Sequence, residues 1–255
     1  MLKKGITANK PALPETVAGF VENVCQKQGA RASPICPPNM ILPFDSGNGR
    51  SRMARIIAKR YFDAKACAFS SRDILLEFTF KETVQHIYEV DAEIQANAEY
   101  ANDYRGVIAF CIDALMPHLG EAAGNKFFEL AEKVKRTAML IIYVPADCSR
   151  KHIDLITGKI GISMKAFPAI AYSDEDLARF FCGFLPSAIN PSKTSKGSVA
   201  PKNMERVIEY ISQNVRRKTI KNIKEAAEST FFDDDAREKL FGKPARKKES
   251  GVIIQ

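Results

Sequence analysis

Hydrophobic and polar residues follow two patterns along this chain: short continuous apolar runs, and longer segments in which apolar residues recur every three or four positions. The first pattern predicts buried strands, and the second predicts amphipathic helices. The expected strands cover residues 40–44, 106–113, 138–147 and 164–172, with a weaker candidate at 66–71. The expected helices cover residues 13–26, 52–62, 81–103, 120–136 and 173–185, and a helix pair follows at 203–232.

The alternation of these strands and helices predicts the α/β class. Strands that are apolar throughout are typical of a parallel sheet covered on both faces, so we expect a three-layer α/β/α sandwich. A connection rich in Pro, Ser and Lys, around residues 186–201, separates the sandwich from the helix pair. We therefore predict an α/β domain over residues 1–186, a small helical domain over 187–242 and a mobile basic tail over 243–255.

Composition narrows the classes of function. With 45% hydrophobic and 27% charged residues, the chain is ordinary for a globular protein. No apolar run is long enough to cross a bilayer, and the first ten residues lack the apolar core of a secretion signal. We therefore expect a cytoplasmic protein without membrane contact. The six cysteines form no C-x-x-C pair, which predicts reduced thiols, and the three histidines have no partner at metal-ligand spacing.

The net charge of +8 is unevenly distributed. Between Lys193 and Lys224 there are nine basic residues and only two glutamates. A region of this kind can contact nucleic acid or an acidic partner. However, no aromatic residue interleaves with the charges between Arg216 and Lys224, as a base-stacking surface requires. A solvated helix face is the alternative, and nucleic acid stays open as a partner.

A glycine-rich turn, FDSGNGRS from Phe44 to Ser51, joins an expected strand to an expected basic helix. A phosphate-binding loop has the pattern G-x-x-x-x-G-K-[ST], and the N-terminus of the helix that follows it attracts anions. The last Gly and the hydroxyl are present here, whereas Phe44 replaces the first Gly and Arg50 replaces the Lys. Two other readings stay open: a turn without a ligand, and an Arg50 that pairs with acidic residues instead of phosphate. The residues expected to bind a nucleotide are Ser46, Gly47, Asn48, Gly49, Arg50, Ser51 and Arg52.

Several segments, taken in order, resemble an AAA+ ATPase domain, most of all the group of stage V sporulation protein K and the red-type rubisco activases. The resemblance covers roughly residues 11–232. PFDSGNGRSRMARIIAKRY resembles the phosphate loop and its helix, and GVIAFCID the Walker B strand. AMLIIYVPAD resembles the sensor 1 strand, FPAIAYSDEDLARFF the approach to the helical lid, and RRKTIKNIKEAAES the sensor 2 helix.

The resemblance implies a P-loop NTPase fold that binds ATP or ADP with magnesium. Ser51 and Asp113 match the positions that hold the metal, and Lys218 matches the sensor 2 position that contacts the nucleotide. Other positions depart from the family. Ala114 stands where a glutamate activates the attacking water, and only Lys165 is found where an arginine finger is expected. Asp147 lies near the polar sensor 1 position, where its charge would repel a γ-phosphate.

We therefore expect a nucleotide-binding or regulatory AAA+-like protein with a degenerate ATPase site and weak or absent hydrolysis. Such a protein would act beside an active AAA+ partner or by self-association. One alternative is an interaction scaffold that uses its basic lid to bind protein or nucleic acid and has no cofactor. The other is a working ATPase whose catalytic carboxylate has moved to Glu77, Glu82 or Glu89.

Overall fold

A computed structural model describes Gly19 and residues 39–64, 75–97, 107–161, 164–169, 172–185 and 201–241 of the chain. These residues form two compact units, which divide between Ala171 and Tyr172. Apart from Gly19, the expected helix 13–26 lies outside the described residues, as do the strand candidate 66–71 and the expected tail 243–255. Among the described helices, none has the length and apolar character needed to span a membrane.

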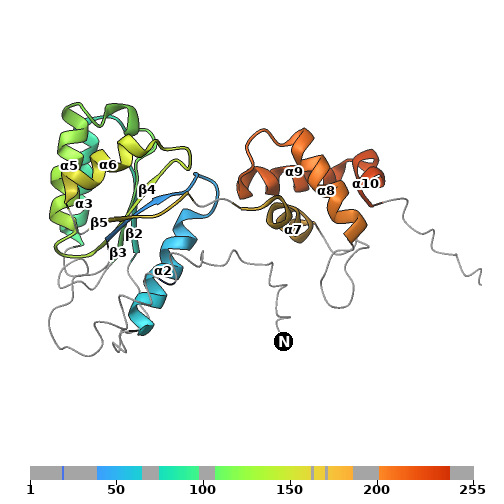
Figure 1. Ribbon diagram of the computed structural model, residues 1–255, viewed down its shortest axis with the longest axis horizontal. Coiled ribbons are helices and arrows are strands. Elements are labelled where there is room, and N and C mark those ends of the chain that lie inside the picture. The colour runs from blue at the N-terminus through green and yellow to red at the C-terminus, as the bar shows by residue number, and fades with distance from the viewer. Residues whose placement is uncertain are drawn as a thin grey trace, which may run out of the picture. The chain divides into compact units, whose positions relative to one another are not determined.

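The first unit contains a five-stranded sheet in the order β2-β3-β4-β1-β5, in which every pair of neighbours is parallel (Figure 1). β1 is fully buried and lies between β4 and the edge strand β5. After β1 the chain crosses to β2 at the opposite edge and then returns through β3 and β4 to β5. The strands are β1 (Asn39–Pro43), β2 (Leu75–Thr79), β3 (Val107–Cys111), β4 (Met139–Val144) and β5 (Met164–Ala166).

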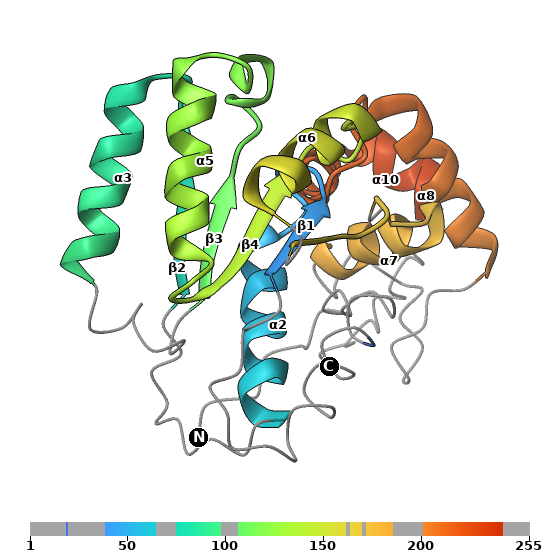
Figure 2. The ribbon, with the colours of Figure 1, turned by 60° about the vertical axis from the view of Figure 1, so that its left-hand side comes forward.

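Helices cover both faces of this sheet. Figures 1 and 2 show α3 (Val84–Ala96), α5 (Ala122–Val134) and α6 (Arg150–Ile160) on one face and α2 (Arg50–Ala64) on the other. Because side chains alternate along a strand, Ile142 of β4 joins the core beneath α5, whereas Tyr143 belongs to the α2 face. The predicted α/β class, a three-layer sandwich with a parallel sheet, is confirmed.

An aromatic cluster packs beneath the carboxyl ends of β2 and β3. The ring of Phe80 meets those of Phe110 and Phe127 edge to face, with centroids 4.9 and 5.2 Å apart. All three side chains are almost fully buried. Such packing is worth about 0.5–1.5 kcal/mol per pair beyond burial, so it fixes the end of β3 from which Asp113 projects.

Two elements of this unit were not predicted. β2 was missed although Phe78 and Phe80 are buried and alternate with Glu77 and Thr79, the period of a half-buried strand. Helix α6 was also missed, although Ser149 caps its first turn by accepting a bond from the backbone N–H of His152. The expected strand 164–172 was too long, because β5 ends at Ala166.

The second unit is helical, as expected, but it begins earlier than the predicted boundary between residues 186 and 187. Helix α7 was assigned to the α/β domain, yet it packs with the later helices through a shared core that includes Phe181, Val207 and Ile223. Its capping box joins Ser173 to Asp176. The helices are α7 (Asp174–Phe184), α8 (Pro201–Asn214), α9 (Ile220–Phe232) and α10 (Asp234–Phe241).

Candidate functional site

The glycine-rich turn lies at the carboxyl end of β1 and opens helix α2, as predicted. Gly47 and Gly49 have φ values of 89° and 88°, a conformation that favours glycine. The Asn48 N–H donates to the carbonyl of Asp45 over 3.2 Å. The connection after β1 leads to α2 on one face, while that after the neighbouring β4 leads to α6 on the other. Ligands of open parallel sheets bind where connections diverge in this way.

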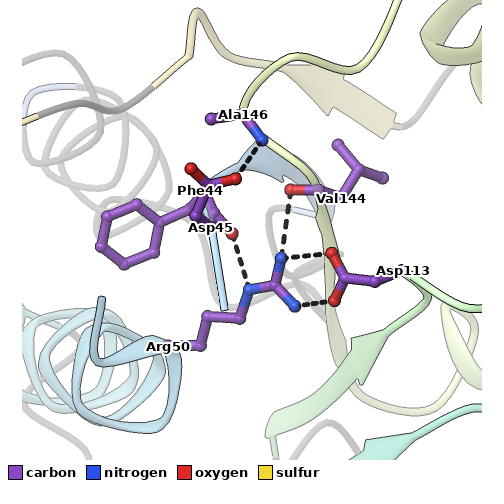
Figure 3. Close-up of polar contacts among 6 residues, drawn as sticks. All are labelled: Phe44, Asp45, Arg50, Asp113, Val144 and Ala146. Carbon is purple, nitrogen blue, oxygen red and sulfur yellow. Dashed lines mark hydrogen bonds and ion pairs between the residues drawn. The ribbon is translucent and has the colours of Figure 1, made fainter. Parts of the chain in front are cut away.

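Phe44 fills the core beside the turn. Its side chain is fully buried, and its ring centroid lies 6.4 Å from that of Tyr143. Figure 3 shows the ring turned away from the guanidinium of Arg50, while the Phe44 carbonyl accepts a bond from Nε of that residue over 2.6 Å. A large side chain at the first position of the loop is therefore accommodated by the core.

Arg50 makes the contacts that define the site (Figure 3). Its Nη2 donates to Oδ1 of Asp113 over 2.7 Å and to the Val144 carbonyl over 3.3 Å, and its Nη1 donates to Oδ2 of Asp113. With the bond from Nε to Phe44, four contacts engage a group that has five N–H donors. The Arg50 side chain is only 6% exposed and that of Asp113 is 35% exposed. The expected alternative, an Arg50 paired with an acidic residue, is therefore what the structure shows.

The electrostatics of the pair follow from these contacts. Burial alone lowers the pKa of Arg50, but the hydrogen bonds and charge of Asp113 outweigh it and raise that pKa above its usual value. Burial also raises the pKa of the neighbouring Cys111 thiol, with the charge of Arg50 acting in the opposite direction. The site therefore combines a permanent cation, a carboxylate and a neutral thiol.

Further bonds fasten the loop to the end of β4. The Tyr143 hydroxyl donates to the Arg50 carbonyl over 2.9 Å, and its ring centroid lies 5.6 Å from the guanidinium carbon. A carboxylate oxygen of Asp45 accepts the Ala146 N–H over 2.9 Å. The loop after β1 is thus held by β4 through both backbone and side chains. Asp45, Tyr143 and Val144 were not predicted as site residues, and only the position of Asp45 within the loop could have indicated its role.

The predicted site residues lie in three places, of which Asp113, just after β3, has been described above. Ser46, Gly47, Asn48, Gly49, Ser51 and Arg52 lie with Arg50 in the loop and first turn of α2. Lys218 belongs to the helical unit, where its Nζ contacts Asp174 over 2.8 Å. Of the positions that depart from the family, Ala114 is exposed directly after Asp113, and Asp147 is exposed beyond β4.

Magnesium, which the resemblance implies, does not fit the arrangement at Asp113. Both carboxylate oxygens of that residue accept bonds from Arg50. The described part of the chain also contains no group of three or more His, Cys, Asp or Glu side chains that could hold a metal ion. Ser51 remains half-buried in the first turn of α2.

No protein-family model and no curated protein matches this chain. It is similar to the solved structure of PCH-2 from C. elegans, with a TM-score of 0.45 and 12% identity over 89% of this chain and 64% of that one. It is also similar to a RuvB variant from Thermotoga maritima, with a TM-score of 0.42 and 12% identity over 88% of this chain and 71% of that one. The structure of ORC1 from Aeropyrum pernix in complex with DNA has a TM-score of 0.41 and 14% identity over 86% of this chain and 66% of that one.

All three of these proteins are AAA+ ATPases. The chain spans only 64% of the length of PCH-2. The parallel order of its five strands shows the α/β fold of this chain directly.

Proposed function

We propose that this chain is an AAA+-like nucleotide-binding or regulatory protein with a degenerate ATPase site, whose ATP hydrolysis is weak or absent. The observation that supports this most is the glycine-rich turn at the carboxyl end of β1, which opens α2 beside Asp113. These are the positions at which the family resemblance puts the phosphate loop and the Walker B aspartate. The protein acts beside an active AAA+ partner or by self-association.

The ligand of the loop is the phosphate chain of ATP or ADP. Backbone N–H groups at a helix N-terminus attract such anions, and the two glycines with positive φ allow close approach of the backbone. Arg52 and Ser51 lie in the first turn of α2 and add a cation and a hydroxyl donor. Arg50 contributes little directly, because four hydrogen bonds direct its guanidinium toward Asp113 and two carbonyls.

Weak hydrolysis follows from what surrounds Asp113. Phosphoryl transfer to water needs a residue that orients the water, and the exposed methyl group of Ala114 cannot do so. Among the carboxylates proposed as replacements, Glu89 on α3 accepts bonds from Gln85 and His86. A working ATPase with a relocated base would show turnover above background that falls on Asp113→Asn.

The alternative of a basic scaffold is less well supported by the charges of the helical unit. Three lysines of this unit are paired with acidic residues. The Nζ of Lys218 lies 2.8 Å from a carboxylate oxygen of Asp174. The corresponding distances are 3.9 Å from Lys221 to Glu225 and 3.5 Å from Lys224 to Glu228. Over residues 172–241 the sequence holds twelve basic and eleven acidic residues, so the two signs nearly balance. The scaffold reading predicts DNA retention that depends steeply on salt and is lost when Arg216, Arg217 and Lys218 become Glu.

Titration with fluorescent ATP and ADP tests the proposed function. Micromolar binding is expected for the unmodified chain, and Gly49→Asp should abolish it, because a carboxylate in the turn repels phosphate. Gly120→Asp is the matched control: it adds the same charge at an exposed turn where a side chain meets nothing within 4 Å. Absence of binding up to millimolar nucleotide, or equal loss in both variants, contradicts the proposal.

A further inference from the structure

The carboxylate of Asp113 is already bound to a cation. In P-loop NTPases the aspartate at this position and the loop hydroxyl hold the magnesium ion. Here both Asp113 oxygens accept bonds from one guanidinium, and the Nη2–Oδ1 contact is 2.7 Å. A guanidinium matches the planar geometry of a carboxylate with two parallel bonds, so this pairing is stronger than a contact with a point charge.

A metal ion cannot easily displace this cation. Arg50 is 6% exposed, and two of its bonds run to the backbone carbonyls of Phe44 and Val144, which hold the guanidinium in place without Asp113. An arginine does not lose its charge in proteins. A divalent ion bound to Asp113 would therefore lie beside a fixed positive charge in a largely buried setting, where repulsion is strong.

We infer that Arg50 replaces the metal, so that the loop binds nucleotide phosphates without a divalent cation. This inference rests on the proposed function and identifies its ligand as the metal-free nucleotide. The ordinary site combines a lysine and a dication with one aspartate, whereas here the charges of Arg50 and Asp113 cancel. Arg52 in the first turn of α2 is the cation that remains for the phosphates, and without a metal the additional charge of a γ-phosphate meets no further positive charge in residues 44–52. ADP is therefore bound at least as tightly as ATP.

Binding of Mn²⁺ alone, followed by electron paramagnetic resonance, tests the replacement without any nucleotide. The unmodified chain should bind Mn²⁺ no more tightly than Asp113→Asn does. Arg50→Ala, which frees the carboxylate, should bind it at least about tenfold more tightly, because a repelling charge is removed. Arg50→Gln serves the same purpose if the alanine variant does not fold, because glutamine also removes the charge but keeps hydrogen-bond donors at this position. Arg55→Ala is the control, since Arg55 is an exposed cation of the same helix.

Titration of the unmodified chain with fluorescent ADP, in EDTA and then in magnesium, tests whether the loop binds nucleotide without a divalent cation. This experiment needs no variant. Equal affinity in the two buffers, with ATP no tighter than ADP, supports the inference. Binding that disappears in EDTA overturns the inference and leaves the proposed function standing. Absence of binding in both buffers overturns both. Mn²⁺ binding by the unmodified chain that is lost in Asp113→Asn also overturns the inference.

Discussion

The α/β unit and the helical unit each contain a cation that was expected to contact phosphate, and each cation lies against an aspartate of its own unit. Arg50 is 6% exposed and makes two bonds to Asp113. Lys218 is 42% exposed, and within the described part of the chain it contacts an Asp174 that is 51% exposed. The same pairing of charges therefore occurs once in a buried site and once in water.

The difference determines which cation can change partners. Breaking a buried pair leaves a charge without compensation, whereas the members of an exposed pair are solvated as soon as they separate. Arg50 consequently stabilises the fold and stays bound to Asp113. Lys218 can leave Asp174 for a ligand at a small cost in free energy. A positive charge at a position of expected function is thus not by itself a binding residue, because its burial and its existing bonds decide whether it is free to bind.

Asp113→Asn should have the largest effect of the substitutions that test this comparison. The amide presents N–H donors to a guanidinium that itself has only donors, and it leaves the Arg50 charge uncompensated. Removing one partner of a fully buried pair costs about 3–5 kcal/mol. Since Asp113 is 35% exposed, we expect a loss of about 2 kcal/mol in the free energy of unfolding. Denaturant unfolding measures it. Asp147→Asn removes an equal charge at an exposed position, and an equal loss in that variant would contradict the assignment.

Gly49→Ala should lower the free energy of unfolding by less than Asp113→Asn does. It tests the backbone conformation of the turn and leaves the Arg50–Asp113 ion pair in place. A Cβ at Gly49 would lie 4.0 Å from the Cβ of Arg52, an ordinary contact, but the φ of 88° is strained for alanine. We expect a loss of about 1 kcal/mol in the free energy of unfolding. Gly158→Ala, in the last turn of helix α6 with nothing within 4 Å, should instead stabilise the chain by about 0.5 kcal/mol. Changes of equal sign would show that the loop does not hold this conformation.

Much of this architecture could be predicted from the sequence, because buried parallel strands are continuous apolar runs. β1, β3 and β4 follow that pattern, and the glycines at positions 47 and 49 indicated the turn. β2 is half-exposed, and its shorter alternating pattern was overlooked. The pairing of Arg50 with Asp113 joins residues that are distant in the sequence and depends on the order of the strands, which no local pattern contains. The sequence therefore left phosphate and an acidic partner as equal choices for Arg50.

Lys218→Ala should have the smallest effect of all. Exposed ion pairs contribute about 0.2–1 kcal/mol, and the carboxylate of Asp174 retains the favourable field of the α7 N-terminus when Lys218 is absent. We therefore expect a change below about 0.5 kcal/mol in the free energy of unfolding. A double-mutant cycle with Asp174→Asn measures the coupling directly, and raising the salt concentration should reduce it further, because exposed charges are screened. A coupling as large as that between Arg50 and Asp113 would mean that the fold holds Lys218 as firmly as it holds Arg50, and that burial does not distinguish the two cations.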